Sequence, residues 1–266
     1  MTASPPRPHS ALLDRIVAAL QRDERLEAVL AGGSLVNGGF DEHSDLDLVV
    51  LVRPEVYVAT MSERRTIAES SGGLLAAFTG EHVGEPRLLI CLYGPPLAHV
   101  DFKFVKPEDL KSLVERPRLL WAREPPEVEQ RLELANITWP ERSPQWFEDR
   151  AWVWLHYCAT KLLRGELYEA VGMLAFFREQ ILGPMLHRKA GRPQRGVRRI
   201  EQDAYASVAL RETVAALDSS AALQALERSI DLYLELRQAD PPRATTPHMP
   251  QALRDFIRTA ASRWNL

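Results

Sequence analysis

The order of hydrophobic and polar positions changes period several times in the first half of the chain. Ser10 is a favourable helix cap, and the apolar residues after it recur at helical spacing, which predicts a first amphipathic helix. Shorter apolar runs bounded by turn residues predict strands, and a further helix is expected over about 55–78. The expected strands cover 26–32, 46–53, 87–93 and 97–105. The last two flank Gly94-Pro95-Pro96 and are expected to form a hairpin.

From residue 145 onward the pattern is helical, with apolar residues at spacings of three and four and few strand signals. The expected helices cover 146–163, 166–189, 207–217, 221–238 and 251–264. The segment 124–144 has four prolines, many charges and no strand pattern, which is typical of a connection between domains. The sequence therefore predicts an α/β domain over 1–123, a linker over 124–144 and a helical bundle over 145–266.

Composition and charge narrow the choice of partners. The 266 residues include 33 basic and 36 acidic side chains, so no strongly basic field favours nonspecific binding of nucleic acid. Cys91 and Cys158 lie within apolar patterns and lack the spacing of a metal or redox site. Residues 1–9 do not read as a signal peptide, and no run of about 18 apolar residues occurs. We therefore expect a cytoplasmic protein with no membrane partner.

A polar motif lies between the first two expected strands. Gly32-Gly33-Ser34 follows an apolar segment, and Asp45-Leu46-Asp47 leads into the apolar run that ends at Val52. Residues two apart on a strand point to the same face, so Asp45 and Asp47 can share one metal ion while Leu46 turns toward the core. A surface turn would also use Asp and Ser, but the combination of glycines, serine and paired carboxylates favours a site for a nucleoside triphosphate and magnesium.

Asp101 is a third candidate carboxylate. The segment from His99 to Phe104 alternates polar and apolar residues, so Asp101 faces away from Val100 and Phe102. If this strand lies beside 46–53, Asp101 reaches the same surface as the two earlier aspartates and completes a cluster for metal ions. The alternative is that Asp101 pairs with Lys103 on a solvated face.

These motifs resemble those of the DNA polymerase beta nucleotidyltransferase superfamily. Gly33-Ser34-Leu35-Val36-Asn37, running into Asp41-Glu42-His43-Ser44-Asp45, is most similar to the aminoglycoside and lincosamide nucleotidyltransferases that confer antibiotic resistance. The motif match covers about residues 26–105, and beyond it the resemblance is one of layout. It implies a nucleotidyltransferase domain with a mixed sheet, followed by an all-α domain that binds the acceptor.

The resemblance also implies a mechanism. Asp45, Asp47 and Asp101 would hold two magnesium ions, which can clamp the attacking and leaving oxygens of a transfer reaction. Ser34 and the amides around Gly33 would bind the β and γ phosphates of ATP. The expected reaction moves AMP, or another nucleoside monophosphate, to a hydroxyl group of a small molecule such as an aminoglycoside.

The general base is less well defined by the sequence. Asp101 is the first candidate, and Glu148 or Asp149 is the next. Asp149, Trp152 and His156 fall on one helical face by their spacing, although a histidine between aromatic residues is commonly a core residue.

The helical half offers candidate contacts for both substrates. Lys161 resembles a helical-domain lysine that contacts the phosphates in kanamycin nucleotidyltransferases, with a solvated lysine as the alternative. Glu166 and Trp152 are residue types that suit a polycationic, sugar-based acceptor, whereas tryptophans at helical spacing also suit a core. A basic cluster lies between His187 and Arg199. Three interpretations of it are open: a solvated loop, a binding site for the triphosphate, or a contact for RNA.

Two other functions remain open at this point. The first is a transferase of a toxin–antitoxin type that modifies a protein or RNA partner, since Arg150 and His156 have the spacing of a motif in helical ribonucleases found beside such enzymes. The second is a noncatalytic nucleotide-binding module. A homodimer, which some relatives use to complete their site, is also left open.

Overall fold

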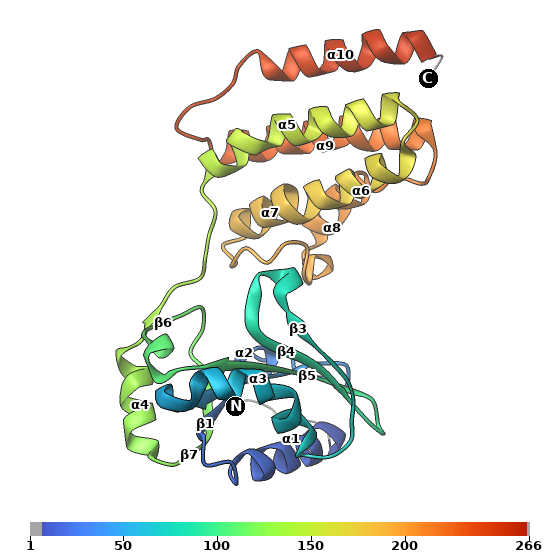
Figure 1. Cartoon of the computed structure of the whole chain (residues 1–266). Helices are drawn as coiled ribbons and strands as arrows, with labels where there is room; N and C mark the ends of the chain where they lie inside the picture. Colours follow the sequence, from blue (N-terminus) through green and yellow to red (C-terminus); the bar gives the residue numbers. More distant parts are fainter. Residues whose placement is uncertain (1–6, 265–266) are drawn as a thin grey trace. The chain divides into compact units, whose positions relative to one another are not determined.

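The computed structural model describes residues 7–264, with side chains described from residue 9 to residue 259. Residues 1–6 lie outside the described residues. They belong to the segment 1–9, which the sequence predicts not to be a signal peptide. The chain divides into two compact units, Met1–Trp139 and Pro140–Leu266. Figure 1 shows that the sheet belongs to the first unit and that the second is built from helices.

The first unit is built on a six-stranded mixed sheet with the strand order β3-β4-β5-β2-β1-β7. β2 and β5 are parallel, whereas the other neighbouring strands are antiparallel. The strands are β1 (Leu26–Ala31), β2 (Leu46–Val52), β3 (Leu74–Gly80), β4 (Glu85–Tyr93), β5 (Ala98–Val105) and β7 (Arg118–Ala122). A small second sheet pairs β6 (Ser112–Leu113) with β8 (Asn136–Ile137).

Helices cover both faces of the large sheet because its central strands bury side chains on both sides. One face packs against α1 (Arg7–Leu20) and α3 (Tyr57–Glu69), with Ile16 and Ile67 in the shared core. The other face packs against α4 (Pro125–Leu134) through Val128 and Leu132. This double cover holds β2 and β5 rigidly at the centre of the sheet.

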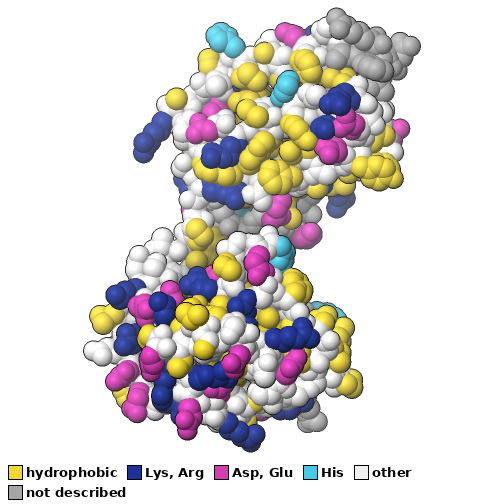
Figure 2. Space-filling model, viewed as in Figure 1, with side chains coloured by type: hydrophobic (Ala, Val, Ile, Leu, Met, Phe, Trp, Pro, Cys, Tyr) yellow, Lys and Arg dark blue, Asp and Glu magenta, His cyan; other side chains and the backbone are white. Residues whose placement is uncertain are grey.

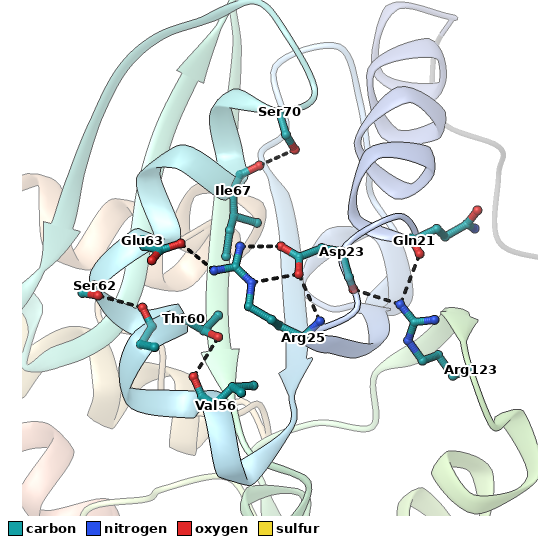
Figure 3. A network of polar contacts seen from close by, with 11 residues as sticks. Gln21, Asp23, Arg25, Val56, Thr60, Ser62, Glu63, Ile67, Ser70 and Arg123 are labelled. Atoms are coloured by element: carbon teal, nitrogen blue, oxygen red, sulfur yellow. Dashed lines mark hydrogen bonds and ion pairs between the residues drawn. The ribbon is translucent and has the colours of Figure 1, made fainter.

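A polar network fixes the turn between α1 and β1 (Figure 3). Arg25 donates hydrogen bonds to both carboxylate oxygens of Asp23, and its other guanidinium nitrogen reaches Glu63 on α3 at 2.6 Å. Arg123, just after β7, donates to the carbonyl oxygens of Asp23 and Leu26. The network therefore ties the start of β1 to a helix and to its neighbouring strand.

The second unit is a bundle whose long helix α5 (Pro144–Leu163) packs against α6, α9 and α10. Ser143 caps α5 by accepting a hydrogen bond from the Trp146 N–H. The other α-helices are α6 (Leu167–Phe177), α7 (Gly183–Lys189), α8 (Ala204–Arg211), α9 (Ser219–Ala239) and α10 (Met249–Trp264). No helix among residues 7–264 combines the length and apolar character needed to cross a membrane.

Two expected segments differ from the structure. The helix expected over 55–78 ends at Glu69, because Gly72 and Gly73 adopt positive φ angles that break it, and β3 follows. The segment 124–144, expected to be a linker, instead contains α4, which packs in the first unit. Its prolines begin this helix, since Pro125 and Pro126 stand in the first turn, where no backbone N–H is needed.

Smaller differences concern element ends. The helix expected over 166–189 is interrupted by a π-helical turn, Arg178–Leu182, which separates α6 from α7. The helix expected over 207–217 begins earlier and ends at Arg211. The strand β7, within 118–122, was not expected because its short sequence carries no alternating pattern.

Candidate active site

The Gly32-Gly33-Ser34 turn lies directly after β1 and is bonded to β2. The Gly32 N–H donates a 2.8 Å hydrogen bond to the carbonyl oxygen of Asp47. Gly33 has φ of 57°, and the space that a Cβ atom would need there is filled by the Asp47 carboxylate. Glycine is therefore required at Gly33 both for its backbone conformation and for the close approach of Asp47.

The pairing of β2 with β5 brings two of the predicted carboxylates side by side. Asp47 and Asp101 are partners in the parallel register, between the buried pairs Leu46–Val100 and Leu48–Phe102. Asp45 precedes β2 by one residue. The expectation that the strand of Asp101 lies beside that of Asp47 is thus confirmed.

His99 is a neighbour of the carboxylates that the sequence did not single out. Its Nε2 lies 2.9 Å from Asp101 Oδ1, and its Nδ1 lies 3.7 Å from Asp45 Oδ1. Its position two residues before Asp101 on the same strand face was the available signal. The expected alternative, a pair of Asp101 with Lys103, is not formed, since Lys103 Nζ lies 2.8 Å from Glu85.

Burial raises the pKa of Asp101 above its ordinary value. The His99 ring opposes this rise through its charge and its hydrogen bond, and the negative charge of Asp45 adds to it. Asp101 is thus a carboxyl group whose proton affinity exceeds that of an exposed aspartate. Shifted pKa values of this kind are common among the side chains of functional sites.

The residue types at this place fit magnesium, because the aspartates supply hard oxygen ligands from adjacent rigid strands. In the described part of the chain, no three His, Cys, Asp or Glu side chains form a ready-made metal cluster. The His99 ring bridges Asp45 and Asp101 and holds one oxygen of Asp101 in a hydrogen bond.

The turn after β1 carries a further contact that the sequence did not indicate. The Gly33 N–H donates a 2.5 Å hydrogen bond to Glu115 Oε1, and the Asn37 amide donates to Glu115 Oε2. Ser34 begins the short helix α2 (Ser34–Asn37) and is half-buried. Nothing in the spacing of Glu115, about eighty residues from Gly33, could have revealed this contact.

The nucleotidyltransferase domain family has a model that matches residues 13–152 of this chain. The chain belongs to this family. The matched region includes β1, the glycine turn and the aspartates on β2 and β5, so the carboxylates described above lie within the nucleotidyltransferase domain. Membership of this family shows that the chain is a nucleotidyltransferase enzyme.

Solved structures with some similarity to this nucleotidyltransferase are distant. An aminoglycoside 6-adenyltransferase from Bacillus subtilis is 14% identical, with 94% of this chain and 97% of that chain covered and a TM-score of 0.41. Cid1, described for its RNA terminal uridylyl transferase activity, is 17% identical, with 68% of this chain and 44% of that chain covered and a TM-score of 0.29. No curated protein matches the sequence.

In the second unit of the nucleotidyltransferase, Glu148 is a structural carboxylate. It is 3% exposed and accepts hydrogen bonds from Trp152, Tyr233 and Thr246, and it pairs with Arg237 at 3.1 Å. Burial acts to raise the pKa of Glu148, but these hydrogen bonds outweigh burial and lower it to about 2. This enclosed, strongly acidic group is unsuited to the role of base proposed from the sequence.

The other candidates on α5 differ in burial. Trp152 is buried, with its indole N–H on Glu148, whereas Asp149 and His156 are exposed. Asp149 accepts a hydrogen bond from Gln145, and the His156 ring lies 4.9 Å from that of Phe256. Their helical spacing places all three on one side of α5, but only Trp152 is buried, whereas Asp149 and His156 reach solvent.

Lys161 contacts two acidic residues of the second unit. Its Nζ is 2.6 Å from Glu166 and 3.2 Å from Glu169, and it lies over the Tyr157 ring. Hydrogen bonds to the two glutamates raise the pKa of Lys161. Lys161 is therefore a firmly held cation, and Glu166 is its partner.

The basic cluster between His187 and Arg199 includes several ion-paired residues. Arg188 contacts Asp240 and Glu141, Lys189 contacts Glu235, and Arg192 contacts Asp203. Arg188, Lys189 and Arg192 also line a cavity of about 550 Å³ whose apolar wall includes Phe147, Met185 and Leu236. Because carboxylates neutralise these cations, the cavity carries no clear preference for an anionic or a cationic ligand.

Proposed function

We propose that this enzyme transfers a nucleoside monophosphate, AMP from ATP, to a hydroxyl group of a small molecule, with magnesium as its cofactor. The observation that carries the proposal is the register of Asp47 with Asp101 on parallel strands, with Asp45 and the Gly33-Ser34 turn at the same end of β2. The aminoglycoside class of acceptor is favoured by the motif from Gly33 to Asp45.

The carboxylates of Asp45, Asp47 and Asp101 would hold magnesium, and magnesium neutralises charge on the phosphates in such reactions. Gly33 and Ser34 would bind the β and γ phosphates through their backbone amides and the serine hydroxyl. The acceptor oxygen forms a bond to the α phosphorus, and the bond from that phosphorus to pyrophosphate breaks.

The acceptor hydroxyl must also lose a proton in this reaction. We propose that Asp101 accepts this proton, because its strand lies beside that of Asp47 and places its carboxylate at the donor site. Asp149, which is exposed on α5, remains the second candidate base. Lys161 is proposed to contact the phosphates, and Glu166 is proposed to contact the acceptor. The ion pair between these two side chains would first have to break.

The direct test is pyrophosphate release by the purified full-length protein with magnesium and each of ATP, GTP, CTP and UTP. The acceptors are a panel of aminoglycosides and lincosamides, each compared with a reaction without acceptor. We expect release with ATP and with at least one aminoglycoside. Absence of release with every pair would overturn the small-molecule acceptor, and ATP binding without any product would instead favour a noncatalytic module.

A further inference from the structure

Glu115 lies on the phosphate-binding turn of the proposed donor site. Its carboxylate accepts hydrogen bonds from the Gly33 N–H at 2.5 Å and from the Asn37 side chain. A Cβ atom on Gly32 would lie 3.0 Å from Glu115 Oε1, so the carboxylate packs closely over both glycines. The backbone N–H that is proposed to bind a phosphate oxygen is therefore already hydrogen-bonded to a carboxylate.

A second carboxylate also approaches Gly33. The Asp47 carboxylate fills the position of the missing Gly33 Cβ, while Glu115 contacts the Gly33 N–H. Two carboxylates therefore approach one residue, and the hydrogen bonds from Gly33 and Asn37 hold the one of Glu115. A phosphate oxygen could replace the Glu115 carboxylate, since both are anions that accept charge-assisted hydrogen bonds from N–H groups.

Glu115 is placed where a side-chain rotation would free the turn. It lies in the short connection from β6 to β7, beside the exposed Val114, while Arg116 is anchored to the Leu132 carbonyl oxygen at 2.6 Å. Rotation of the Glu115 side chain would release the Gly33 N–H without breaking the pairing of β6 with β8 or of β7 with β1.

We propose that Glu115 is an internal competitor of the nucleotide, seated on the Gly33 amide until the triphosphate displaces it. The inference rests on the proposed function, because it concerns the same donor site. When only a fraction of the molecules has an open site, the apparent affinity for the ligand equals the intrinsic affinity multiplied by that fraction. Glu115 therefore lowers the affinity for ATP and sets the concentration at which the enzyme is loaded.

The test is the affinity of the full-length protein for ATP with magnesium, measured by isothermal titration calorimetry. The variants are Glu115→Gln, which keeps the size and removes the charge, and Glu115→Ala, which removes the competing group. We expect Glu115→Ala to bind ATP roughly tenfold more tightly, as loss of a charged hydrogen bond predicts, and Glu115→Gln to lie between it and the unchanged protein.

Glu42→Gln is the matched control, because it removes one negative charge from the loop before β2 at a side chain that is 72% exposed. Equal or weaker ATP binding by the Glu115 variants would overturn the inference and indicate that Glu115 supports the turn. An equal gain in Glu42→Gln would also overturn it, as a general effect of charge. If neither the unchanged protein nor any variant binds ATP, the proposed donor site itself fails, and the inference fails with it.

Discussion

At the scale of single residues, Gly33 is a position where the structure allows little change. Its φ of 57° disfavours any other residue, and a side chain would collide with the Asp47 carboxylate. We predict that Gly33→Ala lowers the free energy of unfolding by about 1–3 kcal/mol and abolishes ATP binding, since Asp47 must move away. Thermal unfolding and calorimetric titration measure the two effects.

Gly84→Ala is the control for the Gly33 prediction. Gly84 also has a positive φ, of 75°, but open space lies where its Cβ would be, and it stands in the turn before β4. We expect this variant to lose some stability and to bind ATP normally. If Gly33→Ala binds ATP as well as Gly84→Ala does, the close packing of Gly33 on Asp47 has no role in the donor site.

Some residues of the candidate site could be found from the sequence, and others could not. Asp45, Asp47 and Asp101 could be found because strand alternation places polar side chains on one face of an otherwise apolar strand. His99 shares that alternation, but a histidine carries no metal-binding pattern by itself. Glu115 reaches Gly33 through the folding of a distant connection, for which local periodicity holds no information.

At the scale of elements, the Glu148 network joins α5 to α9 and to the segment before α10. Glu148 contacts Tyr233 and Arg237 on α9 and both the N–H and the hydroxyl of Thr246. Its pKa is lowered from 4.5 to about 2, so its ionised form stabilises the folded state by roughly 3 kcal/mol. This contribution is complete above about pH 4.5 and is lost as the pH falls through about 2.

We therefore predict that Glu148→Gln destabilises the protein by roughly 3 kcal/mol at neutral pH, and that the difference from the unchanged protein shrinks as the pH falls toward 2. Urea unfolding followed by circular dichroism over this pH range measures the difference. Glu201→Gln, at an exposed glutamate of the same unit, is the control and should have little effect. A difference that is independent of pH would show that the charge of Glu148 does not supply this stabilisation.

The elements also show where local patterns mislead. The core strands β1, β2 and β5 were predictable because their burial follows their hydrophobicity. β3 was mistaken for helix because it is an edge strand with exposed Leu75 and Phe78, so its apolar residues do not report on burial. α4 was mistaken for linker because prolines that begin a helix resemble prolines that prevent one.

At the scale of the whole molecule, charge argues against nonspecific binding of nucleic acid. The chain carries a formal net charge of −3, and Figure 2 shows acidic and basic side chains interspersed on the visible face of each unit. We predict that a mixed-sequence RNA oligonucleotide binds no more tightly than about 10⁻⁴ M at moderate salt, as expected for weak nonspecific contacts. A gel-shift titration measures this affinity, and tight binding that falls steeply with added salt would contradict the prediction.

The proposed role of the carboxylates at β2 and β5 is transfer of a nucleotide to a hydroxyl group of a small molecule. Its most direct measurement is label transfer from α-labelled and γ-labelled ATP to an aminoglycoside, with magnesium, by the unchanged protein and by Asp45→Asn combined with Asp47→Asn. We predict transfer of the α label alone, reduced at least about a hundredfold in the double variant. Transfer of the γ label, or undiminished transfer by the double variant, would contradict the proposed role of these carboxylates.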